Sequence, residues 1–224
     1  MHGVRSLPAT KLKIAAPATG GLRERNKADK LQKIRAAARE LFIENGYEDT
    51  TVREIAQRAG VGLGTLFAYA ADKRDLLFLI FNDELEAVTA SAFQAAKPEL
   101  SFLDQLVAVF RKNYEFFGRQ PALSRFMLRE LTFYVAAPET NRFHAIRERL
   151  QTDLAALVAR AKAEKRLLTT ADPALIARVL AASFAIEIRR WIGDDKPNVA
   201  QGIAALREVL QLLITGLEPI ARVF

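Results

Sequence analysis

The sequence predicts an all-α protein with about nine helices. Apolar residues recur every three or four positions through almost every segment after residue 25, and no segment alternates apolar and polar residues as strands do. Prolines, glycines and capping residues fall between these periodic segments, at the places where helices start and stop. Half of the residues are hydrophobic, which is enough to form a buried core.

The first three predicted helices are short and form an N-terminal head. Gly46 follows the first of them, in the position that often takes a left-handed backbone at a helix end. Thr51 and Glu54 have the spacing of a capping box, which predicts the start of the second helix. The segment Gly60-Val61-Gly62 predicts a tight turn before the third. These helices are expected at residues 26–45, 52–59 and 63–70.

The later helices are longer and are expected to form a larger body. Ser101 and Asn198 are N-cap residues at two of their starts. Asp172 and Pro173 give a third start, because proline suits the first position of a helix. Pro98 breaks the helical pattern between two of the helices. The body helices are expected at residues 73–95, 102–117, 122–135, 138–165, 173–192 and from 199 to about 216–219.

Positive charge is concentrated in the N-terminal third of the chain. The formal net charge is +7, and residues 1–81 hold 14 Lys and Arg against 9 Asp and Glu. This charge favours an acidic partner, such as a nucleic acid or an anionic membrane surface, but a solvated basic tail would give the same composition. Residues 1–22 contain two prolines and three glycines and are expected to form a disordered basic arm.

Several classes of function find no support in the sequence. Cysteine is absent, which excludes disulfides and thiolate chemistry and fits a cytoplasmic location. The two histidines, His2 and His144, make no metal-binding pattern, and no catalytic triad or phosphate-binding glycine loop is recognisable. No apolar run reaches the roughly 18–20 residues of a membrane span. We therefore expect a protein that is not an enzyme, has no cofactor and does not act at a membrane.

Two helices joined by a short glycine turn match the geometry of a helix-turn-helix, in which the second helix enters the major groove of DNA. An ordinary corner between two helices of any helical protein has the same turn chemistry, so the turn alone leaves both interpretations open. A set of residues at fixed spacing goes further: Ile34–Phe42, Asn45–Tyr47, Thr50–Ala56, Ala59–Val61, Gly64–Phe67, Tyr69, Lys73, Leu76 and Leu77.

With these residues, the segment 26–81 resembles the DNA-binding domain of the TetR family of bacterial regulators. The resemblance implies a sequence-specific, homodimeric transcriptional regulator that reads an inverted-repeat operator in double-stranded DNA. Such a protein is usually a repressor that a small hydrophobic ligand releases from its operator. The implied division is a basic arm (1–22), a helix-turn-helix domain (23–72) and a helical ligand-binding and dimerisation domain (73–224). In the alternative function, the body binds a protein partner and no small molecule.

The resemblance also implies which residues meet DNA. Thr65 and Tyr69 supply polar groups near the recognition helix, and Arg53 reaches a guanine edge or a phosphate. Arg53 could instead be a solvated surface residue, Tyr69 a core residue, and the basic arm a solubilising tail. Thr50 and Thr51 have helix capping as an alternative role. The expected DNA-binding residues are Arg25, Lys27, Thr50, Thr51, Arg53, Leu63, Gly64, Thr65, Phe67, Tyr69 and Lys73.

Two further sets are expected in the body. Aromatic residues dominate helices five to seven and form either plain core or an effector pocket lined by Phe110, Tyr114, Phe117, Met127, Glu130, Phe133, Tyr134 and Phe143. The last two helices carry apolar stripes that face either a second copy or the chain's own core. The expected dimer residues are Ala177, Ala181, Phe184, Ala185, Ile188, Leu206, Leu210 and Leu213.

At two positions the sequence departs from the family pattern. Gly62 stands where the family usually has a serine that caps the recognition helix, and glycine is a tolerable N-cap. Ala70 stands where a phenylalanine usually packs beneath the third helix. We expect a looser junction between the third and fourth helices unless Phe67 or Phe78 fills the space.

Overall fold

The structure is a computed structural model that describes residues 21–130 and 136–216. All regular structure in these two ranges is helical, so the all-α prediction is confirmed. The elements are α1 (Leu22–Glu44), α2 (Val52–Arg58), α3 (Leu63–Phe67), α4 (Lys73–Ala92), the 3-10 turn η1 (Phe93–Ala95), α5 (Phe102–Gly118), α6 (Pro121–Glu130), α7 (Pro138–Ala163), α8 (Pro173–Ile192) and α9 (Val199–Thr215).

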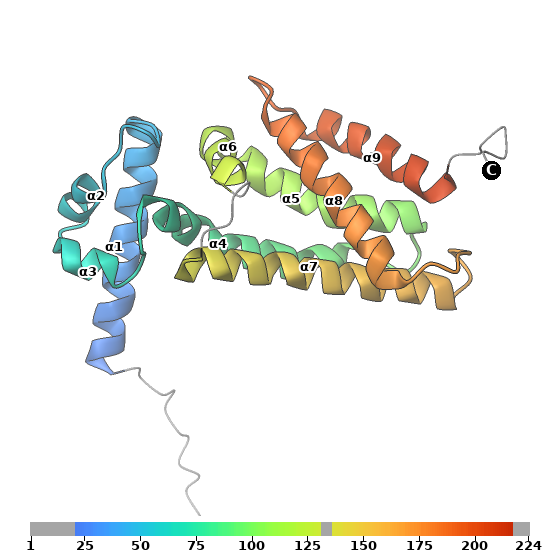
Figure 1. Ribbon diagram of the computed structural model, residues 1–224, viewed down its shortest axis with the longest axis horizontal. Coiled ribbons are helices and arrows are strands. Elements are labelled where there is room, and N and C mark those ends of the chain that lie inside the picture. Colours follow the sequence, from blue (N-terminus) through green and yellow to red (C-terminus); the bar gives the residue numbers. More distant parts are fainter. Residues whose placement is uncertain (1–20, 131–135, 217–224) are drawn as a thin grey trace, which may run out of the picture.

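The molecule is elongated, with a small head of α1, α2 and α3 at one end and the other helices in a body (Figure 1). Helix α4 starts at the head and continues into the body, where it lies alongside α7. Helix α5 packs against α4 and α9, and α8 packs on α7. One continuous helix therefore belongs to both parts of the molecule.

Several helix ends form at the capping residues and the glycine that the sequence predicts. Thr51 Oγ1 accepts a hydrogen bond from the Glu54 amide at 3.2 Å, while the Glu54 carboxylate accepts one from the Thr51 amide at 2.7 Å. Asp172 and Asn198 cap α8 and α9 through their side-chain oxygens. Gly46 has a φ of +85°, the left-handed backbone expected after α1. The predicted capping box, N-caps and closing glycine are thus confirmed.

The start of α1 and the end of α3 differ from the prediction. Helix α1 begins at Leu22 rather than near residue 26, because Leu-Arg-Glu-Arg at 22–25 are all good helix formers. Arg23, Arg25 and Lys27 therefore lie in the helix and not in an arm before it. Helix α3 ends at Phe67, because the amides of Tyr69 and Ala70 bond back to Leu66 in a closing turn. Residues 1–20 of the predicted arm and 131–135 of the sixth predicted helix lie outside the described residues.

Aromatic rings pack the α5, α8 and α9 side of the body tightly. The Phe110 and Phe184 rings stack with centroids 4.5 Å apart, and the Tyr114 and Trp191 rings are 4.7 Å apart. Gly202 of α9 is buried against this cluster. A Cβ atom on Gly202 would lie 2.6 Å from Trp191 Cδ1 and 2.7 Å from Tyr114 Cε1. The glycine is therefore required for the close approach of α9.

We predict that Gly202→Ala destabilises the protein by about 1–3 kcal/mol, because overpacking a rigid aromatic core forces the rings or α9 to move. Chemical denaturation at one fixed protein concentration measures the effect. Gly64→Ala is the matched control, since a Cβ there meets no atom within 4 Å. Equal stability of the wild type and the Gly202 variant would contradict this account of the packing.

Candidate functional site

The head holds α2 and α3 at a fixed angle. Gly60 has a φ of +65°, which lets the chain reverse direction between the two helices. Ile55 from α2 and Leu66 from α3 are fully buried, as is Ile34 of α1 beneath them. The predicted helix-turn-helix geometry is present, and its angle is set by this small apolar core.

The outer side of α3 is exposed and mostly apolar. Leu63 is 38% and Phe67 47% exposed, which is unusual for large apolar side chains in a small domain. Gly64 is exposed between them, and Thr65 is half-buried. An exposed surface of this kind suits contact with thymine methyl groups, with the threonine hydroxyl as a polar group beside it.

The two arginines of α2 differ in their surroundings. Arg58 forms ion pairs with Glu44 at 3.1 Å and Glu40 at 3.5 Å, so its guanidinium lies against α1. Arg53 is exposed. Of these two cations, Arg53 is the one available to a partner in solution.

Four of the expected DNA-binding residues hold the head together. The Thr50 hydroxyl is buried and donates to the carbonyl oxygens of Leu41 and Gly46. Thr51 caps α2. The Tyr69 hydroxyl donates to the Lys27 carbonyl at 3.2 Å. The hydroxyl protons of Thr50 and Tyr69 are used in these bonds, so neither hydroxyl can donate to a phosphate in this arrangement.

Lys73 is the fourth of these residues. Its ammonium donates to the carbonyls of Tyr47 and Glu48, both at 2.9 Å, and lies 4.7 Å from the centre of the Tyr47 ring. An ammonium has three N–H donors, so one remains for a phosphate. Lys73 thus anchors the loop between α1 and α2 to the start of α4.

Basic residues line the first turns of α1. Arg25 and Lys27 are both exposed there, with Arg23 and Lys30 close to them in the sequence. The hydrogen bond from Tyr69 to Lys27 places this end of α1 beside the residues that follow α3. Arg25 and Lys27, both expected to contact DNA, therefore lie at the start of a helix.

The structure locates both departures from the family pattern. Gly62 is the N-cap of α3, makes no side-chain cap, and has free space where a Cβ would lie. Ala70 is buried. Phe67 is exposed and does not fill the space beneath α3, while the Phe78 ring packs on Phe143 with centroids 5.3 Å apart.

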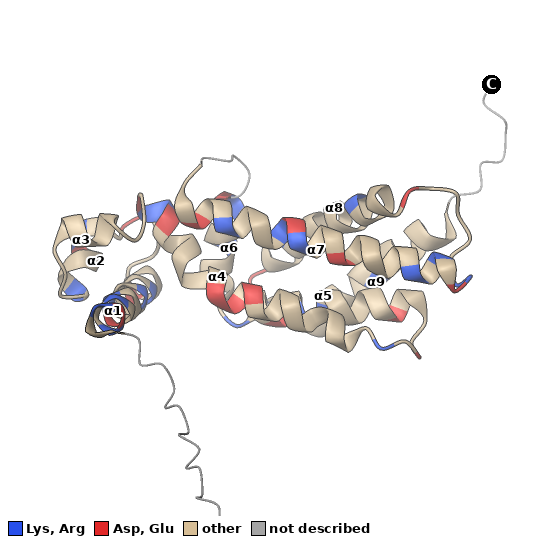
Figure 2. Cartoon of the chain, turned by 90° about the horizontal axis from the view of Figure 1, so that it is seen from below, with Lys and Arg blue, Asp and Glu red and all other residues tan. Residues whose placement is uncertain are grey.

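Ion pairs join the head to the body. Figure 2 shows acidic residues gathered on α4, and these include Asp83 and Glu84. Arg35 of α1 and Arg142 of α7 both pair with Asp83, and Arg39 of α1 pairs with Glu84 at 3.0 Å. Partial burial raises the pKa of Asp83, but hydrogen bonds from Arg142 and Arg35 outweigh it, so the pKa lies below its ordinary value.

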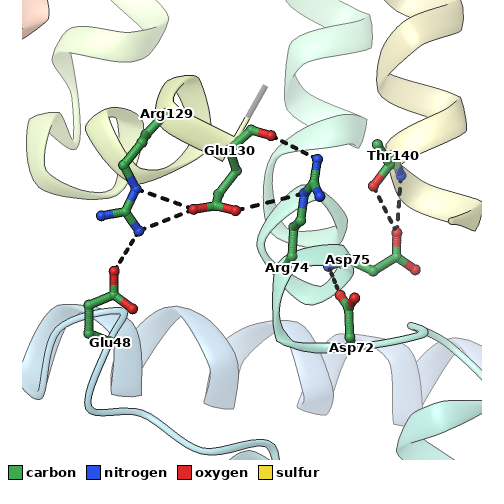
Figure 3. Close-up of polar contacts among 7 residues, drawn as sticks. All are labelled: Glu48, Asp72, Arg74, Asp75, Arg129, Glu130 and Thr140. Carbon is green, nitrogen blue, oxygen red and sulfur yellow. Dashed lines mark hydrogen bonds and ion pairs between the residues drawn. The ribbon is translucent and has the colours of Figure 1, made fainter. Parts of the chain in front are cut away.

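A second group of charges links the head to α6. Arg129 of α6 bonds Glu48 of the head at 2.6 Å and Glu130 at 3.1 Å (Figure 3). Arg74 of α4 donates to the Glu130 carbonyl at 2.8 Å. Glu130, expected in the effector pocket, therefore belongs to this junction.

Asp75 joins α4 to α7. Its carboxylate is fully buried and accepts hydrogen bonds from two amides in the first turn of α7. The Glu139 amide donates at 2.9 Å, and the Thr140 amide donates at 3.0 Å (Figure 3). The other oxygen accepts from the Ala71 amide at 3.0 Å. Ala137, the N-cap of α7, has no side chain that could serve, so Asp75 supplies that cap from a different helix.

A cavity lies between α4, α5, α6, α7 and α8 in the body. Its volume is about 60 Å³, and most of its lining is apolar, including Leu85, Phe117, Phe143 and Phe184. Two of the residues expected at an effector pocket, Phe117 and Phe143, line it.

The other expected pocket residues lie elsewhere. Phe110, Tyr114 and Met127 are fully buried in the core and do not line this cavity, because their rings and thioether fill space between helices. Phe133 and Tyr134 lie outside the described residues. Phe110 and Tyr114 of α5 and Met127 of α6 thus pack in the core of the body.

The expected dimer residues need a correction. Ala177, Ala181, Phe184, Ile188, Leu206 and Leu210 are all buried in the chain's own core, and a side chain covered in this way has no surface to offer a second copy. Leu213 is 41% exposed and Ala185 is half-buried. Helix α8 has a second apolar stripe on its outer side, and this stripe is exposed: Leu175, Val179, Ala182 and Ile186.

The sequence was compared with known families and proteins. The profile of a family described as "Bacterial regulatory proteins, tetR family" matches residues 34–80. This segment of the chain is therefore similar to the N-terminal segment of TetR-family regulators. The matched segment covers α1 from its middle, the helix-turn-helix and the first half of α4, so the resemblance stated from the sequence is confirmed.

Two curated relatives match only part of this chain. The fatty acid metabolism regulator protein of Bacillus subtilis is 30% identical over 90 residues, which are 40% of this chain and 46% of that protein. The regulator HbdR of Aromatoleum is 40% identical over 58 residues, which are 26% of this chain and 25% of that protein. The chain thus matches less than half of the length of these relatives.

Solved structures show that the likeness extends to the whole fold. FadR of Thermus thermophilus, in complex with lauroyl-CoA, has a TM-score of 0.63 and 24% identity, covering 86% of this chain and 98% of that one. FadR of Bacillus subtilis, in complex with stearoyl-CoA, has a TM-score of 0.66 and 21% identity, covering 84% and 99%. At this identity the likeness establishes the arrangement of helices alone.

Among the described residues, no helix has the length and apolar character needed to cross a membrane. The same residues contain no group of three or more side chains suited to hold a metal ion.

We predict that Asp75→Asn destabilises the protein by about 3 kcal/mol, because the asparagine NH₂ would face an amide donor where a carboxylate oxygen accepts now. Asp72→Asn is the matched control, since Asp72 is only an N-cap, accepting from the Asp75 amide at 2.7 Å, and asparagine caps as well. Urea denaturation compares the two. An equal loss of stability in both variants would show that the hydrogen bonds from Asp75 to α7 do not stabilise the protein.

Proposed function

We propose that the protein is a DNA-binding transcriptional regulator that acts as a homodimer on an inverted-repeat operator. The observation that carries this proposal is the exposed face of the helix-turn-helix. It places Leu63 and Phe67 of α3 in solvent on a rigid core, with Thr65 half-buried between them and Arg53 exposed on α2. A surface of this kind is costly in water and is covered when α3 enters a major groove.

The residues divide into two groups by the contact they make. Arg53 reads a guanine edge, and Leu63 and Phe67 contact thymine methyl groups, which together supply sequence preference. Arg25, Lys27 and the remaining donor of Lys73 contact phosphates and supply orientation and affinity. Thr50, Thr51 and Tyr69 position these groups from within the head.

A second copy supplies the other half of the DNA-binding surface. The stripe Leu175, Val179, Ala182 and Ile186 follows the spacing of one helix face, and Ile186 is 62% exposed. Leu213 of α9 lies near Leu175 and Val179, where together they line one groove. Pairing of two such faces buries an apolar surface and places two heads for two half-sites.

The body responds to a small apolar effector. The cavity is lined by Leu85 and Thr89 of α4, and Lys73 at the other end of the same helix anchors the head. At the rise of an α-helix, Lys73 lies about 18 Å from Leu85 and about 24 Å from Thr89, so a small tilt of α4 at the cavity moves the head. The acyl-CoA complexes of the two FadR structures support an effector of apolar character.

The first experiment measures DNA binding by fluorescence anisotropy, with a labelled duplex from the DNA that flanks the protein's own gene and a scrambled duplex. We expect the flanking duplex to bind at least about 1000-fold more tightly. Arg53→Ala should weaken this specific binding by about 1–3 kcal/mol, since it removes a bidentate contact. Lys27→Ala should lower the log–log salt slope by about 0.9 for each lost phosphate contact.

Arg58→Ala is the matched control for Arg53→Ala, because Arg58 lies on the same helix and is paired with Glu44. It should bind the duplex as the wild type does. If Arg58→Ala and Arg53→Ala lose affinity equally, or if both duplexes bind with the same weak affinity, the proposed interface is wrong.

The dimer face is tested by Ile186→Glu. Because Ile186 is exposed in the single chain, the variant should fold but sediment as a monomer and bind the inverted repeat more weakly. Ile43→Glu is the control, as Ile43 is 57% exposed on α1 in the head. Analytical ultracentrifugation and circular dichroism give the two readouts. If the Ile186→Glu variant is still a dimer, the dimer interface lies on another surface of the protein.

A further inference from the structure

Two arginines interrupt the apolar lining of the body cavity. Arg147 of α7 and Arg189 of α8 both line it, while the other polar residues of the lining, Thr89, Asn113 and Gln151, are neutral. No aspartate or glutamate is among the lining residues. An apolar cavity of this kind with two cations and no anion has an uncompensated positive charge.

Among the described residues, the hydrogen-bond partners of Arg189 are neutral carbonyl groups. Its guanidinium donates to the carbonyl of Ala185 at 2.9 Å and to that of Leu128 at 3.4 Å. Within the described ranges, neither Arg189 nor Arg147 forms an ion pair with a carboxylate. This is unusual for a partly buried arginine, because burial of a charge is costly unless an opposite charge is near.

The surroundings of these arginines confirm that positive charge accumulates here. Burial and the charge of Arg147 together lower the pKa of Arg189 below its ordinary value. Burial and the charge of Arg147 also lower the pKa of His144, on α7 next to the cavity-lining Phe143, although Glu148 acts in the opposite direction. A bound anion would relieve this repulsion and increase the stability of the body.

We propose that the cavity binds a carboxylic acid with an apolar tail, and that Arg147 and Arg189 hold its carboxylate while the tail lies among Leu85, Phe117 and Phe143. Two guanidiniums can bind one carboxylate with several charge-assisted hydrogen bonds. This inference rests on the proposed effector function of the same cavity and adds the charge of the ligand. It makes the two arginines specificity-determining residues.

The volume of the cavity sets how such a ligand enters. About 60 Å³ holds a few atoms, whereas cavities for small-molecule ligands usually measure about 300–1,000 Å³. An acid with a long tail must therefore separate α4 from α7 and α8. The carboxylate would be held on α7 and α8, so the tail would displace α4, the helix that continues to the head.

The test is isothermal titration calorimetry of the full chain with sodium dodecanoate, 1-dodecanol and lauroyl-CoA, without DNA. We expect dodecanoate to bind about tenfold or more tightly than dodecanol, which has the same tail and no charge. Equal affinity for dodecanoate and dodecanol overturns the proposal. So does binding of lauroyl-CoA with no binding of dodecanoate, because the thioester lacks the carboxylate.

Variants assign the effect to the two arginines. Arg147→Met and Arg189→Met should each reduce the affinity for dodecanoate about tenfold and leave that for dodecanol unchanged. Arg189→Lys, which keeps the charge, should restore part of the preference even if the methionine variant loses stability with its two carbonyl contacts. Arg160→Met, at an exposed position of α7, should behave as the wild type. An unchanged preference in both methionine variants refutes the assignment.

Calorimetry without DNA separates this inference from the proposed function. A protein that binds its operator specifically but shows no preference for dodecanoate remains a regulator with a different effector. Preferential binding of dodecanoate by a protein without specific DNA binding supports the arginine site and refutes the regulatory role.

Discussion

The arrangement of this molecule depends on a single helix that is shared by the head and the body. Residues at the start of α4 complete the head, since Lys73 holds the loop after α1, and residues at its middle line the body cavity. Asp75 fixes the angle of this helix, because its buried carboxylate caps α7 and also bonds Ala71. A buried carboxylate is tolerated only when its oxygens are bonded, so α4 and α7 cannot separate at this end without a large cost.

This constraint determines which movements are easy. Near Asp75 the two helices are pinned by buried hydrogen bonds, whereas about ten residues further along α4 a small, mostly apolar cavity lies between α4, α7 and α8. The ion pairs of Asp83 and Glu86 with Arg142 of α7 lie at the partly exposed side of this region. Apolar contacts are not directional and can be replaced by those of a ligand tail. Under the proposed function, an effector at the cavity would pivot α4 about its pinned end. The partly exposed ion pairs of Asp83 and Glu84 with α1 could re-form after a small shift, since pairs near the surface contribute little.

Much of the fold could be read from the sequence because its signals are local. A capping box, an N-cap or a closing glycine involves residues a few positions apart, and all those named above occur as expected. The start of α1 was predicted too late, because the residue before Leu22 is a glycine and gives no side-chain cap that marks the helix start. The roles of Thr50, Tyr69 and Lys73 depend on contacts across 4 to 42 positions of the sequence, and spacing within the motif does not reveal these partners.

Helix α8 shows most clearly why the rest could not be predicted. It is apolar on two sides, and a periodic pattern identifies both stripes without saying which one the chain covers itself. The inner stripe contains the bulkiest residues, Phe184 and Trp191, and these pack on α5, which is a partner far away in the sequence. The outer stripe of Leu175, Val179, Ala182 and Ile186 stays exposed in the single chain, and it is the face proposed above for a second copy. Arg189 lies between these two sides and is half-buried. Its guanidinium therefore lines the cavity and also donates to the carbonyl of Ala185 in its own helix.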